Sequence, residues 1–455
     1  MDEVTENRSG ADLTPALAGR ASALCYDELP APVRELTRQC VLDYLGVTIA
    51  GAQDPLVRIL LDETAEAAGS PQASVIGHSM RLPVLSAALV NGAAAHALDY
   101  DDVNMAMPGH PSVAILPGLL ALAELKGSSG REVVTAFVAG YETACRIGAA
   151  LQPGHYNLGF HSTGTVGSFG AAAACARLLG LDAEVTAIAL GIAGTQAAGL
   201  KSQFGTMCKP FHAGKAAQNG LLAARLAARG FSSRADIVEC VQGFASTHGP
   251  DFAPDAALAT PEAGFHLLAN LFKYHAACYF THAPIECARR LREEHRLTPD
   301  MIGGITLRLD ASCDRVCNIP VPTDGLQSKF SLRQTLAMAL AGVDTASLGS
   351  YSAENACDPS LVGLRERVRF EWRQNWPQTL SELDLDLVDG RHLTTRHDAG
   401  IPAADIGKQG RRLTAKFDAL VEPRLGAPRA RELRQMIAGL DDVTDVGSLA
   451  RLAIG

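Results

Sequence analysis

Titratable side chains are concentrated in four segments whose other residues are mainly small or apolar. Histidine, lysine and aspartate in such surroundings can exchange protons or hold carboxylates. Glycine and proline lie beside several of them, which indicates helix ends where side chains can converge on a cleft. The segments are AAAHALDYDDVNMAMPGHPS with His96, Asp99, Asp101, Asp102 and His110, GFHSTGT with His161, LKSQFGTMCKPFHAGKAAQNG with Lys201, Lys209, His212 and Lys215, and LFKYHAACYFTHAP with Lys273, Tyr274, His275, Cys278 and His282.

The first two segments each allow a structural and a functional interpretation. His96 and Asp99 are three positions apart, so on a helix they could form a structural pair. Together with Asp102 and His110 they could instead ligate a metal, but no further ligand spacing supports one and we predict none. His161 could order a loop before a helix, or it could act in catalysis because imidazole titrates near neutrality.

The third and fourth segments also leave alternatives open. Lys209 follows Cys208 and precedes Pro210 in an uncharged stretch, so it is either an exposed loop charge or a desolvated base, and we favour the base. His212 could bind a partner or pack in the interior. Cys278 could be a buried thiol or a nucleophile, and we favour the buried thiol because cysteines are scattered along the chain.

Spacings typical of nucleotide, hydrolase and zinc sites do not occur in the sequence. GTVGSFG over residues 164–170 fits neither a dinucleotide fingerprint nor a phosphate-binding loop. GxSxG, HExxH and zinc-type Cys/His spacings are also missing. The residues by themselves therefore indicate general acid–base chemistry on an anionic small molecule.

Most of the first 270 residues have helical spacing, so helices must position these segments. PAPVRELTRQCVLDYLGVTIAGA and SGREVVTAFVAGYETACRIGAAL carry apolar residues every three or four positions, and Pro32 and Gly51 suit the ends of the first. The Ala-rich segments 170–181 and 218–228 predict closely packed helices in the centre of a bundle. Residues 185–200 predict a buried helix, because the apolar run is too short for a membrane span.

Apolar and polar residues alternate between about residues 300 and 400. GGITLRLD, VRFEW and LSELDLDLVDGRHLTTRHD predict strands of an antiparallel sheet with one solvated face, and Asp389-Gly390 predicts a tight turn. Helical spacing returns after about residue 405. We therefore predict a mainly α fold, with a large all-helical domain over 1–270 and 405–455 and a smaller α+β lid domain with an antiparallel sheet over 271–404.

The composition excludes several classes of partner. The 455 residues include 40 Lys and Arg against 49 Asp and Glu, a net charge of −9, which argues against nucleic-acid and anionic-membrane binding. Eleven scattered cysteines form no CxxC pair, and the polar N-terminal MDEVTENRSGADLTP is unlike a signal peptide. We expect a cytoplasmic protein with a small-molecule ligand.

The motif segments resemble the MmgE/PrpD family, which includes 2-methylcitrate dehydratase, cis-aconitate decarboxylase and iminodisuccinate epimerase. The resemblance spans VLDYLGVTIAGA, LDYDDV with GHPS, HSTGTVGSFGAA, KPFHAGKAAQNGLLAA and KFSLRQTLAMAL, of which KPxHxGxAAxxG is the most specific. It implies a helical domain, a smaller α+β lid, a homodimer and a cofactor-free site between the domains. It also implies an active site at Asp99, His110, His161, Lys209, Cys278 and Gln334.

The sequence departs from both of the better-known patterns in the family. Where the dehydratases have LDFNDT and HPSDN, this chain has LDYDDV and HPSV, and the dehydratases lack the HSTGT segment. The decarboxylase pattern has a Thr where this chain has Val103, a His where it has Cys278, and a Tyr near the position of Gln334. Loss of these hydrogen-bonding groups favours the epimerase branch.

We therefore hypothesise an isomerase that epimerises the α-carbon of a small di- or tricarboxylate of the iminodisuccinate type without a cofactor. Lys209 would be one base, His110 or His161 would act from the opposite face, and Asp99 would orient an imidazole. The alternatives are a lyase that removes water or carbon dioxide and a non-catalytic carboxylate-binding protein. The residues expected to bind the substrate are His212, Asp102, Cys278, Gln334 and Lys273.

Overall fold

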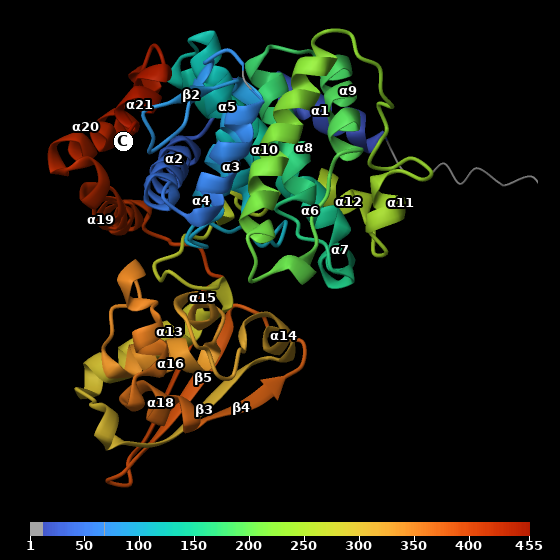
Figure 1. Ribbon diagram of the computed structural model, residues 1–455. Helices are drawn as coiled ribbons and strands as arrows, with labels where there is room; N and C mark the ends of the chain where they lie inside the picture. The colour runs from blue at the N-terminus through green and yellow to red at the C-terminus, as the bar shows by residue number, and fades with distance from the viewer. Residues whose placement is uncertain (1–11, 68) are drawn as a thin grey trace, which may run out of the picture. The chain divides into compact units, whose positions relative to one another are not determined.

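The computed structural model describes residues 12–67 and 69–455 (Figure 1). These residues form two compact units. Unit 1 comprises the described residues up to Asn270 together with Asp405–Gly455, and unit 2 comprises Leu271–Ala404. The predicted fold class is confirmed, because unit 1 is almost entirely helical and the main sheet lies in unit 2.

Unit 1 contains a helical bundle and the antiparallel pair β1 (Ala73–Ser74) and β2 (Arg81–Leu82). Its α-helices are α1 (Leu13–Ala23), α2 (Ala31–Gly51), α3 (Pro55–Glu66), α4 (Val84–His96), α5 (Pro111–Lys126), α6 (Gly130–Leu151), α7 (Gly154–Leu158), α8 (Thr165–Leu178), α9 (Ala183–Gly194), α10 (Cys208–Ala227), α11 (Phe244–His248), α12 (Pro254–Leu258), α19 (Ile406–Leu425), α20 (Ala427–Ala438) and α21 (Gly447–Leu452). Short 3-10 turns are η1 (Tyr26–Glu28), η2 (Lys201–Gln203), η3 (His266–Ala269) and η8 (Leu440–Asp442).

Local sequence signals explain where several of these helices begin and end. Ser129 and Glu132 form a capping box at the start of α6, and Gly127 ends α5 in the left-handed conformation with φ 68°. A proline in the first turn starts α2. The helices predicted over 30–52 and 129–151 are confirmed as α2 and α6.

Helices α4, α5, α8 and α10 pack closely, and their ends position the site described below. A Cβ atom on Gly92 of α4 would lie 2.7 Å from the Cα of Gly214 on α10, so these two backbones approach at a distance that only glycine allows. The Ala-rich segments 170–181 and 218–228, predicted to be central, lie mostly in the buried helices α8 and α10, which end at Leu178 and Ala227. Of the buried helix predicted over 185–200, only the part up to Gly194 is helical, as α9. No helix among the described residues is long and apolar enough to span a membrane.

Unit 2 is a four-stranded sheet covered by short helices. The sheet order is β4 (Val368–Arg373), β3 (Ile302–Asp310), β5 (Leu380–Leu387) and β6 (His392–Asp398). The predicted hairpin is confirmed: β5 and β6 are antiparallel, and Gly390 takes φ 88° in the turn. The helices are α13 (His282–His295), α14 (Asp314–Cys317), α15 (Gly325–Lys329), α16 (Leu332–Ala341), α17 (Ala353–Cys357) and α18 (Pro359–Glu366), with 3-10 turns η4 (Tyr279–Thr281), η5 (Pro299–Met301), η6 (Ala311–Cys313) and η7 (Leu348–Ser350).

The prediction of a purely antiparallel sheet is wrong for one pair of strands. β3 and β4 run parallel, with Ile305 opposite Val368 and Leu309 opposite Trp372. A parallel pair needs a long crossover connection, and helices α14 to α18 provide it between these two strands. The sheet is therefore mixed, with an antiparallel edge hairpin and a parallel edge strand.

Candidate active site

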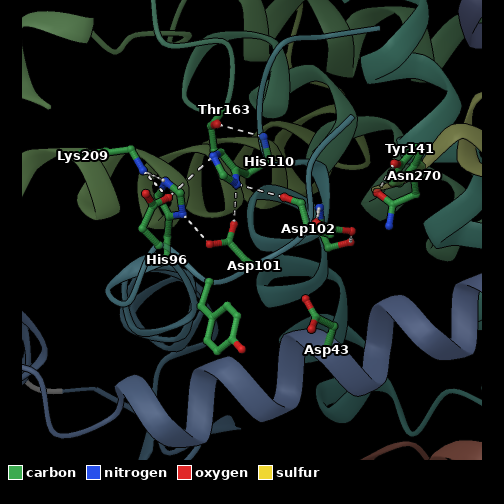
Figure 2. Close-up of polar contacts among 12 residues, drawn as sticks. Asp43, His96, Asp101, Asp102, His110, Tyr141, Thr163, Lys209 and Asn270 are labelled. Carbon is green, nitrogen blue, oxygen red and sulfur yellow. Dashed lines mark hydrogen bonds and ion pairs between the residues drawn. The ribbon is translucent and has the colours of Figure 1, made fainter. Parts of the chain in front are cut away.

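Polar side chains from four distant segments of unit 1 gather where helices begin or end (Figure 2). α4 ends at His96, and a turn with further acids follows it. His110 is the N-cap of α5, His161 lies in the short segment before α8, and Lys209 lies in the first turn of α10. We call this group the polar cluster. Its members are His96, Asp99, Asp101, His110, His161, Lys209 and His212.

Lys209 is the cation of the polar cluster. Its side chain is 8% exposed, and Nζ donates a hydrogen bond to Asp99 Oδ1 at 2.7 Å. Nζ also lies 3.2 Å from His96 Nε2 and 5.5 Å from the ring centroid of Phe204. Of the two interpretations of this lysine, the structure excludes the exposed loop charge.

Asp101 lies between two imidazoles. His96 Nδ1 donates to Asp101 Oδ1 at 2.9 Å, and His110 Nδ1 lies 2.9 Å from Asp101 Oδ2. His110 Nδ1 is also 2.9 Å from the main-chain oxygen of Asp102. Every one of these neighbours is an acceptor, so Nδ1 carries the hydrogen in both rings. In the neutral rings, Nε2 of His96 and Nε2 of His110 are therefore the basic nitrogens.

The two Nε2 atoms lie near the Lys209–Asp99 pair. His96 Nε2 accepts from Lys209, and His110 Nε2 is 3.9 Å from Asp99 Oδ1. The ring centroids of His96 and His110 are 4.5 Å apart. One ammonium, one carboxylate and two oriented imidazoles thus meet within one small volume, as proton transfer requires.

His161 and His212 form a second imidazole pair beside the first. Their Nδ1 atoms are 3.0 Å apart, so one ring donates and the other accepts. His161 is 2% exposed and lies edge-on to Phe204 with 5.0 Å between the centroids, whereas His212 is half-buried. Of the two histidines, His212 is the one with more access to solvent.

Burial favours the uncharged form of three imidazoles of the polar cluster, those of His96, His161 and His212. It lowers the pKa of His96 to about 3, even though Asp101 acts in the opposite direction. Burial and the nearby Lys209 ammonium hold the pKa of His161 well below its usual range and also lower the pKa of His212. For Asp101, burial favours the neutral acid, but the His96 and His110 rings outweigh it and hold the pKa well below the ordinary value.

Asp99 has a strained backbone conformation. Its φ is 51°, in the left-handed region that residues other than glycine rarely occupy, although aspartate tolerates it better than most. Its amide donates to the main-chain oxygen of His96 at 3.2 Å, which closes the turn after α4. This turn directs the Asp99 carboxylate to Lys209, and strain of this kind concentrates at functional sites.

Asp102, predicted to bind substrate, is instead held against α5. Its side chain is fully buried, accepts from the Ser112 amide at 3.3 Å and lies 2.5 Å from Ser112 Oγ. Burial, together with the charges of Asp43 and Asp101, raises its pKa to about 7, although the hydrogen bond with Ser112 acts against this. These contacts hold the Asp102 carboxyl in the interior, and its role in substrate binding stays a prediction.

The raised pKa of Asp102 makes a prediction about stability. The acid is favoured in the folded state, so its contribution is complete below about pH 4 and is lost as the pH rises through about 7. Between pH 5 and 8 the free energy of unfolding of Asp102→Asn should rise by about 3 kcal/mol relative to the unsubstituted protein. Urea unfolding of both proteins measures this difference. The pH-dependent contributions of the buried histidines are the same in both proteins and cancel in it. A difference that stays constant with pH would contradict the assignment.

Three predicted substrate-binding residues lie in unit 2. Gln334 is fully buried on α16, where Nε2 donates to the Asn355 main-chain oxygen at 2.9 Å and Oε1 accepts from Arg365 at 2.8 Å. Cys278 is 7% exposed and Lys273 is 1% exposed. Gln334 is thus bonded within unit 2, and roles for Cys278 and Lys273 stay predictions.

Four members of the polar cluster could also be considered as metal ligands. Atoms of His96, Asp99, Asp101 and His110 all lie within 4.8 Å of one another. Asp101, however, lies against two protonated Nδ1 atoms, and the Lys209 ammonium already lies beside Asp99 Oδ1 and His96 Nε2. A divalent ion would have to displace this ammonium, so the donor set fits an internal cation better than a metal.

Asp101 was not among the predicted site residues, and the structure pairs His96 with Asp101 instead of the expected Asp99. The expected partner was Asp99 at i+3, but α4 ends at His96, and the turn brings Asp101 to its Nδ1. The run of three acids in LDYDD was the available signal. Which acid faces which base depends on the turn, and spacing alone does not give it.

Two comparisons with protein families cover most of the chain. Residues 15–256 match the MmgE/PrpD N-terminal domain, and residues 275–442 match the MmgE/PrpD C-terminal domain. The polar cluster lies within the first match.

Several relatives that match over nearly their whole length share one name. The chain is 27% identical to a cis-aconitate decarboxylase of Aspergillus terreus, over 98% of this chain and 97% of the relative. It is 28% identical to cis-aconitate decarboxylase of Homo sapiens, over 97% and 95% of the two chains. A cis-aconitate decarboxylase of Mus musculus is 27% identical over 97% of this chain and 93% of its own length. All three relatives are thus named as decarboxylases.

Proposed function

Because the chain belongs to the MmgE/PrpD family, we propose that it is a lyase acting on a small polycarboxylate, with decarboxylation of cis-aconitate as the first reaction to test. The observation that carries the proposal is the buried Lys209 ammonium beside the imidazoles of His96 and His161, which burial keeps neutral near pH 7. It provides positive charge for a carboxylate and basic nitrogens for proton transfer at the same point.

Decarboxylation of an unsaturated tricarboxylate makes two demands on the protein. The bond from one carboxylate to its neighbouring carbon breaks, carbon dioxide leaves, and the electron pair moves into the adjoining double bond. Negative charge then develops beside a remaining carboxylate. A proton must next bond to carbon, so that one proton is consumed for each carbon dioxide released.

The polar cluster can meet both demands with its own residues. In the proposed reaction Lys209 acts as the cation that stabilises the developing charge, because its Nζ is already the donor to Asp99 and His96. His110 or His161 delivers the proton. An anionic substrate beside an imidazole favours the protonated imidazole, so substrate binding would give the proton donor its charge. This assignment replaces the hypothesis that Lys209 is the base.

The epimerase hypothesis now ranks second. The similarity to the relatives named cis-aconitate decarboxylase extends over nearly the whole length of both chains. The departures at Val103, Cys278 and Gln334 concern single side chains. Gln334 is bonded to Arg365 and Asn355, so its difference from the family tyrosine need not alter proton transfer in unit 1.

The test is a reaction in deuterated water followed by NMR. The protein is incubated separately with cis-aconitate, 2-methylcitrate and iminodisuccinate, with Lys209→Met protein as the control for contaminating activity. Release of carbon dioxide from cis-aconitate, with one solvent deuterium in the product, supports the proposal. Deuterium at the α-carbon of iminodisuccinate without loss of carbon would favour the epimerase, loss of water the dehydratase, and binding without turnover a carboxylate-binding protein.

We also propose that the protein works as a homodimer without a bound cofactor, as the family resemblance implies. Sedimentation velocity of the purified protein should give twice the mass of one chain, and activity should survive extensive dialysis against a chelator. A monomer with full activity would reject the first part, and inactivation restored by a divalent metal would reject the second.

A further inference from the structure

Helix α19 brings a buried lysine to the turn that carries Asp99 and Asp101. Lys416 Nζ donates to the main-chain oxygen of Tyr100 at 2.6 Å and lies 2.6 Å from Asp43 Oδ1. Nζ is also 3.9 Å from the ring centroid of Tyr100. We propose that Lys416 is a positioning residue that clamps this turn and thereby aims Asp99 and Asp101, an inference that rests on the proposed function of the polar cluster.

The place of the hydrogen bond explains why one lysine can affect two acids. Tyr100 lies between Asp99 and Asp101, and its carbonyl belongs to the peptide plane whose nitrogen is that of Asp101. Fixing this oxygen fixes the orientation of that plane. On the other side of Tyr100, Asp99 is held at φ 51°, a conformation that persists only where its surroundings enforce it.

Burial strengthens the clamp. Lys416 is 8% exposed and Asp43 on α2 is 4% exposed, so both charges are removed from most of the solvent. An ammonium so placed needs a carboxylate partner and further acceptors, and Asp43 and the Tyr100 oxygen provide them. The lysine thus has two separable contacts, one that balances charge and one that holds the turn.

Charge balance alone is the competing explanation. In that case Lys416 would matter only because Asp43 would otherwise be a buried unpaired anion. Removing both charges together distinguishes the two roles, because the double variant Asp43→Asn/Lys416→Met has no unpaired charge but also lacks the donor to Tyr100.

A matched control exists between the same two helices. Gln409 on α19 donates to Gln39 Oε1 on α2 at 3.0 Å, and both side chains are buried. The double variant Gln39→Leu/Gln409→Leu removes a buried polar contact between α2 and α19 and leaves Lys416 in place. It should not alter the turn.

The experiment measures hydrogen–deuterium exchange, thermal unfolding and steady-state kinetics for these variants. For Asp43→Asn/Lys416→Met we expect an unfolding midpoint near that of the unsubstituted protein, at least about tenfold faster exchange at residues 99–104, and a kcat at least about tenfold lower with little change in KM. The Gln39→Leu/Gln409→Leu protein should change neither exchange in the turn nor kcat.

Two results would overturn the inference. One is normal exchange at residues 99–104 with normal kcat in Asp43→Asn/Lys416→Met, which would leave charge balance as the whole role of Lys416. The other is faster exchange throughout unit 1, which would make the lysine a general stabilising residue. If the unsubstituted protein has no lyase turnover, the proposed function fails by itself, and exchange in the turn still decides the role of Lys416.

Discussion

Replacing Lys209 with methionine is expected to lower kcat/KM for the polycarboxylate substrate by about 10³- to 10⁵-fold. Methionine keeps much of the length and apolar surface of the side chain but removes the ammonium that lies 2.7 Å from Asp99 Oδ1 and 3.2 Å from His96 Nε2. The developing negative charge then faces Asp99 without a cation beside it. Steady-state kinetics with the substrate identified by NMR measure the loss.

The controls for this variant separate chemistry from stability. Lys209→Met leaves the Asp99 carboxylate buried without its cation, which lowers the stability of the fold as well. The double variant Asp99→Asn/Lys209→Met removes both charges and should recover stability but not activity. Lys215→Met tests a half-buried lysine on the same helix, bonded to Gln218, and should keep nearly full activity. Activity of Lys209→Met within tenfold of the unsubstituted protein would contradict the assigned role.

Much of the fold could be predicted because its signals are local. Helices α2 and α6 carry apolar spacing and end signals within their own sequences, and the β5–β6 hairpin has alternation on both sides of Asp389-Gly390. The parallel pairing of β3 with β4 has no such signal. It depends on a crossover through five helices, which alternation within either strand does not reveal.

Most members of the polar cluster could be predicted from the sequence, but His96 and Asp101 were not among the predicted site residues, and the pairings could not be predicted. Histidines, acids and Lys209 beside glycines and prolines do lie at helix ends, where helix packing brings them together. Lys209 and Asp99 are 110 positions apart, however, and nothing in either segment specifies that contact. The pairing of His96 with Asp101 likewise follows from the left-handed turn at Asp99, since an uninterrupted helix would have placed Asp99 beside His96.

Replacing Asp101 with asparagine should lower kcat by about 10³-fold and leave KM nearly unchanged. The carboxylate accepts from His96 Nδ1 at 2.9 Å and lies 2.9 Å from His110 Nδ1, so it favours the same tautomer in both rings. An amide has one oxygen and one NH₂ group. Whichever way it turns, its NH₂ group faces an Nδ1–H. Facing His96, it makes that ring change tautomer; facing His110, whose Nδ1 keeps the Asp102 main-chain oxygen as its acceptor, it makes that ring move. That ring then no longer presents a basic Nε2 to the Lys209–Asp99 pair.

The neighbouring acid provides the matched control for Asp101→Asn. Asp102 has a pKa of about 7 and is therefore mostly protonated at pH 6, where asparagine imitates the neutral acid against Ser112. Asp102→Asn should accordingly keep kcat within about threefold at pH 6. The nitrogen NMR shifts of His96 and His110 report the tautomers directly, and a change in the Asp101→Asn protein alone is expected. Unchanged tautomers with a large loss of kcat, or equal losses in the two variants, would show that Asp101 does not act by orienting the rings.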